Sequence, residues 1–134
     1  MPGGSETMRL LLDTHTLLWW VSDHPALSPA ADDALNDPAH EVFVSAASAW
    51  EVTTKARLGK LVAGPLAQDF VGEVARQGFL PLPVTLDHGQ RAGNLPGAHR
   101  DPFDRMLIAQ AQAENLVLVS NETLFDSYGV RRLW

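Results

Sequence analysis

The sequence contains no cysteine and no long apolar stretch, although 46% of its 134 residues are apolar. Without cysteine the chain forms no disulfide and offers no thiolate to a metal, and its five histidines lack the paired spacings of zinc sites. No apolar run approaches the roughly 18 residues of a membrane-spanning helix. These absences favour a soluble protein of the reducing cytoplasm, with no membrane partner.

Basic residues are also scarce. Ten lysines and arginines stand against 16 acidic residues, so the formal net charge is −6. A phosphate backbone is normally held by positive charge, and this balance argues against a nucleic-acid partner unless bound metal ions supply that charge.

The length of the chain suits one domain and is too short for two. Residues 1–7, MPGGSET, are polar and glycine-rich and lack the basic and apolar parts of a signal peptide. We therefore expect a flexible leader over residues 1–7, followed by a single domain over residues 8–134.

Short apolar runs alternate with helical patterns along the domain. Strands are predicted at 9–12, 41–44, 79–84, 116–119 and 130–134. Helices are predicted at 14–21, 29–36, 45–58, 65–77, 85–92, 102–114 and 121–128. Two prolines in 79–84 indicate a strand at or near the sheet edge. The alternation is typical of an α/β fold in which helices cover both faces of a parallel sheet of about five strands.

Acidic side chains recur where strands end or where the following helices begin. Asp13 follows the first strand and Glu51 lies in the helix after the second. Asp101 and Asp104 open the helix before the fourth strand, and Glu122 follows that strand. Because ligands of an open parallel sheet bind outside the carboxyl ends of its strands, we expect these acids to converge at one edge.

Each acid also has an ordinary structural explanation. Asp13 and Asp101 suit helix N-caps, and the last acid suits the first turn of a short helix. Glu51 matches a capping box with Ser48 and a helical pair with Lys55. Taken together, however, clustered carboxylates raise one another's pKa, and Mg²⁺ or Mn²⁺ is their usual compensation. Such a cluster is suited to phosphate chemistry.

Four segments together resemble the PIN-domain proteins, and most closely the toxin ribonucleases of bacterial VapBC toxin–antitoxin pairs. The segments are LLLDTHTLLWW, SAASAWEVTTK, HRDPFDRMLIAQAQAENLVLVSNE and LFDSYGVRRLW. The resemblance covers residues 8–134 and implies a three-layer α/β/α fold. It also implies endoribonuclease activity with one or two Mg²⁺ or Mn²⁺ ions, a homodimer, and a VapB-like antitoxin that blocks the site.

The resemblance assigns the candidate catalytic and metal-binding acids. The family's first three acids fall on Asp13, Glu51 and Asp104. Its fourth is usually the aspartate of a T-x-D segment, where this chain has Ser120, Asn121 and Glu122. Glutamate is one methylene longer than aspartate, so Glu122 departs from the family's pattern and is a candidate for reaching the metal through a water.

The expected reaction is hydrolysis of RNA, with tRNA or ribosomal RNA as the favoured substrates, by a metal-activated water that leaves a 5′ phosphate and a 3′ hydroxyl. Thr14 and Ser120 are candidates for holding waters or an acid in place, or else are ordinary turn and helix-start hydroxyls. Arg100 is the first choice for contacting substrate phosphates, with Arg105 beside it. Pairing with nearby acids is the alternative for both arginines.

Three other functions are weighed against this one. The altered fourth segment is compatible with a catalytically weak PIN fold that binds RNA or protein, and a structure-selective DNase would have the same metal site. A phosphatase of the haloacid-dehalogenase type also begins with an apolar strand and Asp13, but it requires a second aspartate where this chain has His15. The chain has four tryptophans, Trp19, Trp20, Trp50 and Trp134. Most of this apolar surface is expected to pack in the core, and the excess is a candidate for a dimer or antitoxin interface.

Overall fold

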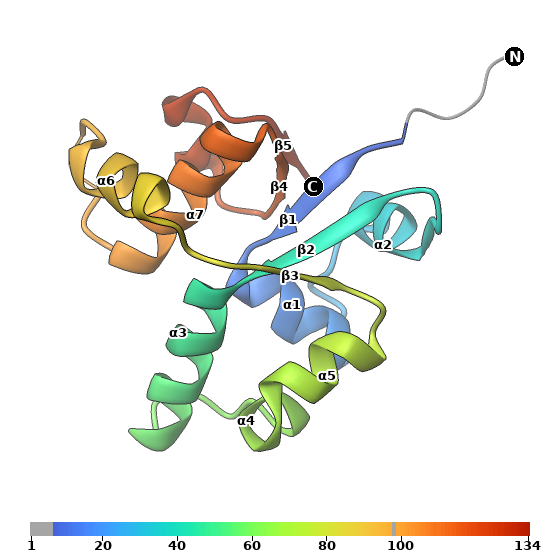
Figure 1. The fold of residues 1–134 in the computed structure, drawn as a ribbon. Helices are drawn as coiled ribbons and strands as arrows, with labels where there is room; N and C mark the ends of the chain where they lie inside the picture. Colours follow the sequence, from blue (N-terminus) through green and yellow to red (C-terminus); the bar gives the residue numbers. More distant parts are fainter. Residues whose placement is uncertain (1–6, 98) are drawn as a thin grey trace, which may run out of the picture.

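The computed structural model describes residues 7–97 and 99–134, so the predicted leader lies outside the described residues except for its last residue. Within this part of the chain five strands form one parallel sheet in the order β3-β2-β1-β4-β5 (Figure 1). The strands are β1 (Arg9–Leu12), β2 (Glu41–Ser45), β3 (Leu80–Leu82), β4 (Val117–Val119) and β5 (Arg132–Leu133). The parallel sheet is confirmed, and the proline-containing strand β3 lies at its edge as predicted.

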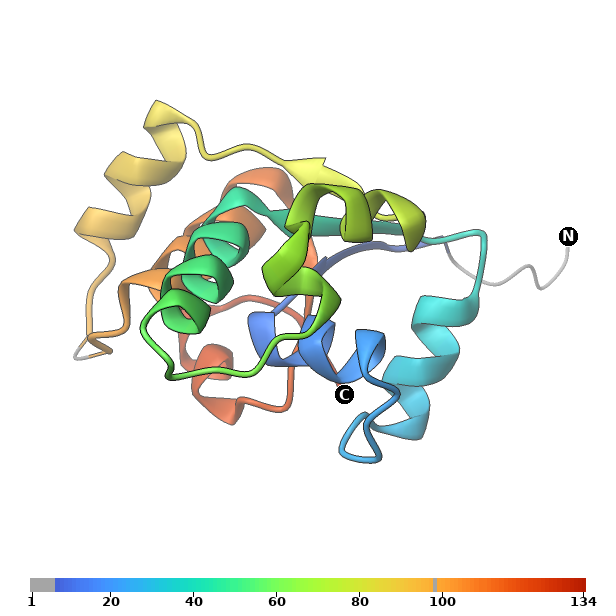
Figure 2. The same ribbon diagram turned by 90° about the horizontal axis from the view of Figure 1, so that it is seen from below.

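Helices cover both faces of this sheet, which confirms the predicted α/β/α arrangement. The α-helices are α1 (Thr14–Val21), α2 (Pro29–Asn36), α3 (Ala46–Arg57), α4 (Pro65–Gln68), α5 (Phe70–Arg76), α6 (Leu86–Asn94) and α7 (Pro102–Glu114). A 3₁₀ helix, η1 (Thr123–Tyr128), precedes β5. Figure 2 shows α1 and α2 next to one another along one side of the strands.

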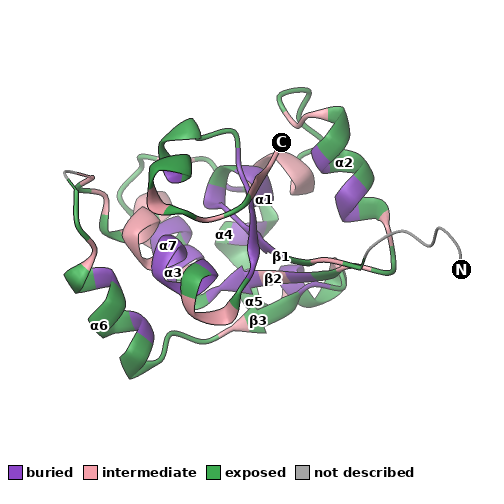
Figure 3. Cartoon of the chain, turned by 90° about the horizontal axis from the view of Figure 1, so that it is seen from above, coloured by how far each residue is buried: buried purple, intermediate pink, exposed green. Residues whose placement is uncertain are grey.

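Two apolar clusters hold the layers together, and β1 contributes to both. Leu10 and Leu12 pack with Leu17 of α1 on one face, whereas Leu11 packs with Ile108 of α7 on the other. This alternation follows from the two-residue period of a strand. All three leucines of β1 are fully buried, as expected of the central strand of a doubly covered sheet. Figure 3 shows the centre of the sheet buried and α6 largely exposed.

Two local predictions are wrong. The single helix predicted over 65–77 is divided at Asp69, whose carboxylate accepts a hydrogen bond from the Gly72 N–H and caps α5. The capping box predicted for Ser48 and Glu51 does not form, because Ser45 caps α3 one turn earlier. Ser48 and Glu51 therefore lie inside the helix, where both side chains are available for contacts with other segments.

The helix that carries Asp104 has the predicted bounds. Asp101 caps α7, Pro102 occupies its first position, and Asn115 ends it in the left-handed conformation. Within the described part of the chain, no helix combines the length and apolar character needed to cross a membrane.

Candidate active site

The carboxyl ends of β1, β2 and β4 open onto one edge of the sheet, where α1 and α3 also begin (Figure 1). Asp13 is the first residue after β1, the central strand. Ser120 is the first residue after β4 and Ser45 ends β2, so the segments on both sides of Asp13 end at this level. The topology therefore brings polar groups from distant parts of the sequence together.

Asp13 is buried and held from two directions. Its Oδ1 accepts hydrogen bonds from the backbone N–H groups of His15 at 2.7 Å and Thr16 at 3.2 Å, which makes it the N-cap of α1. Its Oδ2 accepts a hydrogen bond from the Ser120 hydroxyl at 2.5 Å. Burial raises the pKa of Asp13, and the bond from Ser120 opposes this rise. The predicted N-cap is confirmed, and the cap also faces the end of β4.

Glu51 is buried on α3 and is held by α1. The Thr14 hydroxyl donates a hydrogen bond to Glu51 Oε1 at 2.7 Å and lies 3.0 Å from the Ser48 hydroxyl. The Lys55 ammonium donates to Glu51 Oε2 at 2.5 Å, which confirms the predicted helical pair. Thr14 follows Asp13 directly, so two adjacent residues connect β1 to both β4 and α3.

Asp104 lies in the first turn of α7, partly exposed. The His99 Nε2 lies 2.9 Å from its Oδ2. Burial, together with the negative charges of Asp101 and Asp13, raises the pKa of Asp104 to about 6, although the hydrogen bond from His99 opposes the rise. Asp104 is therefore held by a residue of the preceding loop, and the charge of Asp13 contributes to its raised pKa.

Lys55 supplies positive charge to this group of acids. Its pKa is raised by the hydrogen bond to Glu51 and then by the charges of Glu51, Asp101 and Asp104. Its Nζ also lies 5.9 Å from the centre of the Phe103 ring. One ammonium thus contacts Glu51 of α3 and lies near the ring of Phe103 in the first turn of α7, next to Asp104 in the sequence.

Glu122 lies beyond β4 at the rim of the site. It is exposed, and its side chain makes no capping bond to η1. Its backbone N–H donates to the Ser120 hydroxyl at 3.0 Å. The Ser120 carbonyl in turn accepts from Arg132, which is paired with Asp126. The backbone before Glu122 is therefore well anchored, whereas the carboxylate itself is exposed at the rim.

The two candidate substrate arginines have different surroundings. The Arg105 guanidinium donates to the backbone carbonyls of Ala92, Leu95 and His99 at 3.1, 2.5 and 3.1 Å. It therefore fastens the end of α6 and the following loop to α7, which favours a structural role. Arg100 is exposed and makes no side-chain hydrogen bond or ion pair with any residue that the structure describes.

Sequence reasoning missed two parts of this site. It did not identify His99 as the partner of Asp104. It also did not foresee that Arg105 binds three carbonyls. Neither contact joins residues at the regular spacing of a helix or a strand. The conformation of the loop before α7 determines which carbonyls and carboxylates these side chains reach, and no sequence pattern predicts that conformation.

The donor chemistry of the site fits a hard divalent cation. Across residues 7–97 and 99–134 no three acidic or histidine side chains are close enough to enclose an ion. Glu51 is paired with Lys55, and Asp104 with His99. Carboxylate oxygens are nevertheless the ligands that Mg²⁺ and Mn²⁺ prefer. Burial first, and then the charges of Asp101 and Asp13, raise the pKa of Asp104, and a bound cation would offset the repulsion between these charges. The residues present therefore fit such an ion.

Comparison with known families agrees with this arrangement. A family model described as the PIN domain matches residues 10–130. The chain belongs to the PIN-domain family. This confirms the family indicated by the sequence, and PIN domains generally use divalent metal ions. A comparison with curated protein sequences finds no significant match.

Solved structures share the fold of this PIN domain at low sequence identity. DNA-bound VapBC from Salmonella typhimurium is 18% identical with a TM-score of 0.70, over 94% of this chain and 97% of the other. VapBC2 from Rickettsia felis, bound to a promoter DNA fragment, is 17% identical with a TM-score of 0.68, over 93% and 97%. VapBC-1 from nontypeable Haemophilus influenzae is 14% identical with a TM-score of 0.64, over 93% and 96%.

Proposed function

We propose that this PIN domain is a Mg²⁺- or Mn²⁺-dependent endoribonuclease and the toxin of a toxin–antitoxin pair. The observation that carries the proposal is that Asp13, directly after β1, and Glu51, on α3, are both buried carboxylates held by hydroxyl groups of other segments. Asp104, in the first turn of α7, is the third acid of the proposed site. The fold shared with VapBC complexes supports the toxin assignment.

The acids are the residues that would hold the metal. Asp13, Glu51 and Asp104, with Glu122 at the rim, would provide its carboxylate ligands, and a bound ion supplies positive charge and a water of lowered pKa. The chain's own hydroxyls orient two of these ligands. Ser120 binds Asp13, and Thr14 binds Glu51, so each carboxylate keeps one oxygen in a defined direction.

Positive side chains near the acids would position the RNA. Lys55 lies between the acids of α3 and α7, where it reduces the repulsion that the cluster exerts on a phosphate. Arg100 precedes α7 and is exposed, so its guanidinium is available for a bidentate contact with phosphate oxygens. The Arg105 guanidinium instead donates its hydrogen bonds to backbone carbonyls and keeps the loop between α6 and α7 in place.

The proposed partners follow from the same comparison. The solved relatives are VapBC complexes, and we infer that this chain likewise has a VapB-like antitoxin and forms a homodimer. Its place of action is expected to be the cytoplasm, the compartment of its proposed tRNA or ribosomal RNA substrate.

The deciding experiment is cleavage of total tRNA and ribosomal RNA by purified, antitoxin-free protein. We expect discrete fragments with 5′ phosphates in Mn²⁺ and none in EDTA or with Asp13→Asn. Asp33→Asn is the matched control, because Asp33 is an exposed acid on α2. Equal cutting of single-stranded DNA would favour a DNase, and retention of RNA without cutting would favour a binding module.

A further inference from the structure

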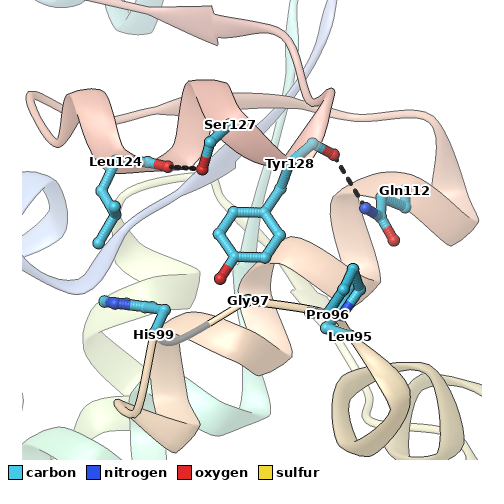
Figure 4. A pocket seen from close by; sticks show the side chains of 8 residues that line it. All are labelled: Leu95, Pro96, Gly97, His99, Gln112, Leu124, Ser127 and Tyr128. Atoms are coloured by element: carbon cyan, nitrogen blue, oxygen red, sulfur yellow. Dashed lines mark hydrogen bonds between the residues drawn. The ribbon is translucent and has the colours of Figure 1, made fainter.

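A pocket lies between the loop that leads into α7 and the helix η1 (Figure 4). Its volume is about 640 Å³, within the range of pockets that hold small organic groups. Its lining includes Gly97, His99, Gln112, Leu124, Ser127 and Tyr128. No aspartate, glutamate, lysine or arginine is among the described residues that line it.

Both walls of this pocket belong to segments that carry candidate acids. His99 lines the pocket, and its Nε2 lies 2.9 Å from Asp104 Oδ2, so a single imidazole separates the pocket from the acidic cluster. The opposite wall is η1, which begins directly after Glu122. The pocket therefore adjoins the segments that carry Asp104 and Glu122.

The polar atoms of the pocket retain capacity for hydrogen bonding. The Tyr128 hydroxyl has no hydrogen-bond partner among the described residues and points toward the loop at Gly97 (Figure 4). The Gln112 amide nitrogen donates to the Tyr128 carbonyl at 3.0 Å, which leaves its Oε1 as an acceptor. The Ser127 hydroxyl donates a hydrogen bond to the Leu124 carbonyl at 2.9 Å.

Gly97 allows the loop to approach Tyr128 closely. Its φ is +94°, a conformation that side-chain-bearing residues rarely adopt. A Cβ added at Gly97 would lie 2.9 Å from the Tyr128 hydroxyl, which is too close without movement of the ring. The loop therefore approaches the phenol closely only because this position has no side chain.

We propose that the pocket receives an RNA base adjacent to the scissile phosphodiester. A base is flat and uncharged and has hydrogen-bond groups at its edge, which matches an aromatic ring, apolar walls and unused polar atoms. A phosphate would require positive charge, which the lining lacks. Recognition through a base would add a contact with RNA that does not depend on positive charge, beside those proposed for Lys55 and Arg100.

This inference rests on the proposed ribonuclease function and identifies the part of the site that selects the RNA. The first test is cleavage of an RNA library with a randomised loop, followed by sequencing of the cut ends. We expect wild-type protein to prefer one base beside the cut. Tyr128→Ala should raise KM by about 10-fold with a smaller change in kcat, because stacking on the ring is lost. Tyr128→Phe should keep binding but weaken the base preference.

Matched leucines control for general effects of a smaller side chain. Leu124 lines the pocket and is 44% exposed, whereas Leu86 is 94% exposed on α6 and does not line it. We expect Leu124→Ala to raise KM and Leu86→Ala to leave it unchanged. Thermal unfolding of all variants would show whether each one is folded.

A binding measurement tests the pocket without turnover. RNA carrying 2-aminopurine at successive positions is mixed with Asp13→Asn protein, in which Tyr128 is intact. We expect quenching at one position beside the cut, and its loss in the Asp13→Asn, Tyr128→Ala double variant.

The outcomes separate the two proposals. RNA cleavage with KM and base preference unchanged in Tyr128→Ala would overturn the pocket proposal and leave the ribonuclease function standing. Absence of RNA cleavage by wild-type protein would overturn the ribonuclease function, and the pocket proposal with it.

Discussion

The two halves of the acidic edge are built in different ways. Asp13 and Glu51 are 4% and 5% exposed, and each accepts a hydroxyl hydrogen bond from another segment. The Asp104 side chain is 27% exposed and is held by a histidine from the preceding loop. Glu122 is exposed, without a side-chain bond to the helix that it precedes.

The difference reflects which elements position each acid. The sheet and the helices that follow its strands position Asp13 and Glu51, whereas loops position Asp104 and Glu122. Asp13 follows the central strand, whose neighbours on both sides restrict its backbone. Asp104 instead depends on the cap Asp101 and on the three carbonyl contacts of Arg105. We therefore infer a preorganised half at Asp13 and Glu51, and an adjustable half at Asp104 and Glu122.

Removing the charge of Asp13 should have the largest effect. Asp13→Asn is expected to lower RNA cleavage by about 10³-fold, equivalent to about 4 kcal/mol of transition-state stabilisation. Asparagine still accepts the bonds that cap α1, so the melting temperature should change by only a few degrees. Initial rates and thermal unfolding measure the two effects. A variant that cuts RNA at the wild-type rate would remove Asp13 from the reaction.

Removing the hydroxyl of Thr14 should have the next largest effect. Thr14→Val keeps the shape of this buried side chain but deprives Glu51 Oε1 of its donor. We expect cleavage to fall by about 10- to 100-fold and the free energy of unfolding to fall by about 1–3 kcal/mol. Thr14→Ser should recover most of both. Wild-type activity in Thr14→Val would mean that Lys55 alone orients Glu51.

Asp104, in the adjustable half, should make the free energy of unfolding of the metal-free protein depend on pH. The pKa of Asp104 rises from 3.8 to about 6 on folding, so the folded chain holds the proton more tightly. Stability should therefore fall as pH rises from about 4 to about 6 and stay lower above that range, by about 1–2 kcal/mol after allowance for solvent screening. Urea unfolding in EDTA at several pH values measures this fall.

Asp104→Asn is the control for this pH effect. It should flatten the fall in stability between pH 4 and pH 6 and should make the metal-free protein more stable than wild type above pH 6. Mn²⁺ should stabilise wild type more than Asp104→Asn, because a ligand that binds only the folded state shifts unfolding by mass action. An unchanged slope in the variant would show that another group is responsible.

Glu122 should give the smallest effect. Because its carboxylate is exposed and unconstrained, Glu122→Gln is expected to lower cleavage by less than about 10-fold. Glu122→Asp tests whether the shorter side chain found in the T-x-D pattern performs better. A loss as large as that of Asp13→Asn would place Glu122 among the principal ligands and would contradict the proposed division of the site.

Much of this arrangement could be predicted from local sequence signals. The strand and helix patterns indicated the parallel sheet, and the positions of Asp13 and Glu51 after β1 and β2 indicated where they meet. The cap role of Asp101 followed from the proline after it. Asp69 was missed because a helix with a cap in its middle has the same apolar period as an uninterrupted one.

The sequence by itself determined that a parallel sheet is covered by helices on both faces, because this depends on short-range periodicity and on chain direction. It also determined that acids stand at the ends of strands and the starts of helices. Only the tertiary structure decided the partners of those acids. The hydrogen bond from Thr14 to Glu51 joins residues 37 positions apart in the sequence, and that from Ser120 to Asp13 joins residues 107 positions apart. No local sequence pattern therefore predicts either bond. The pocket at Tyr128 likewise exists only because the loop at Gly97 and η1 fold against α7.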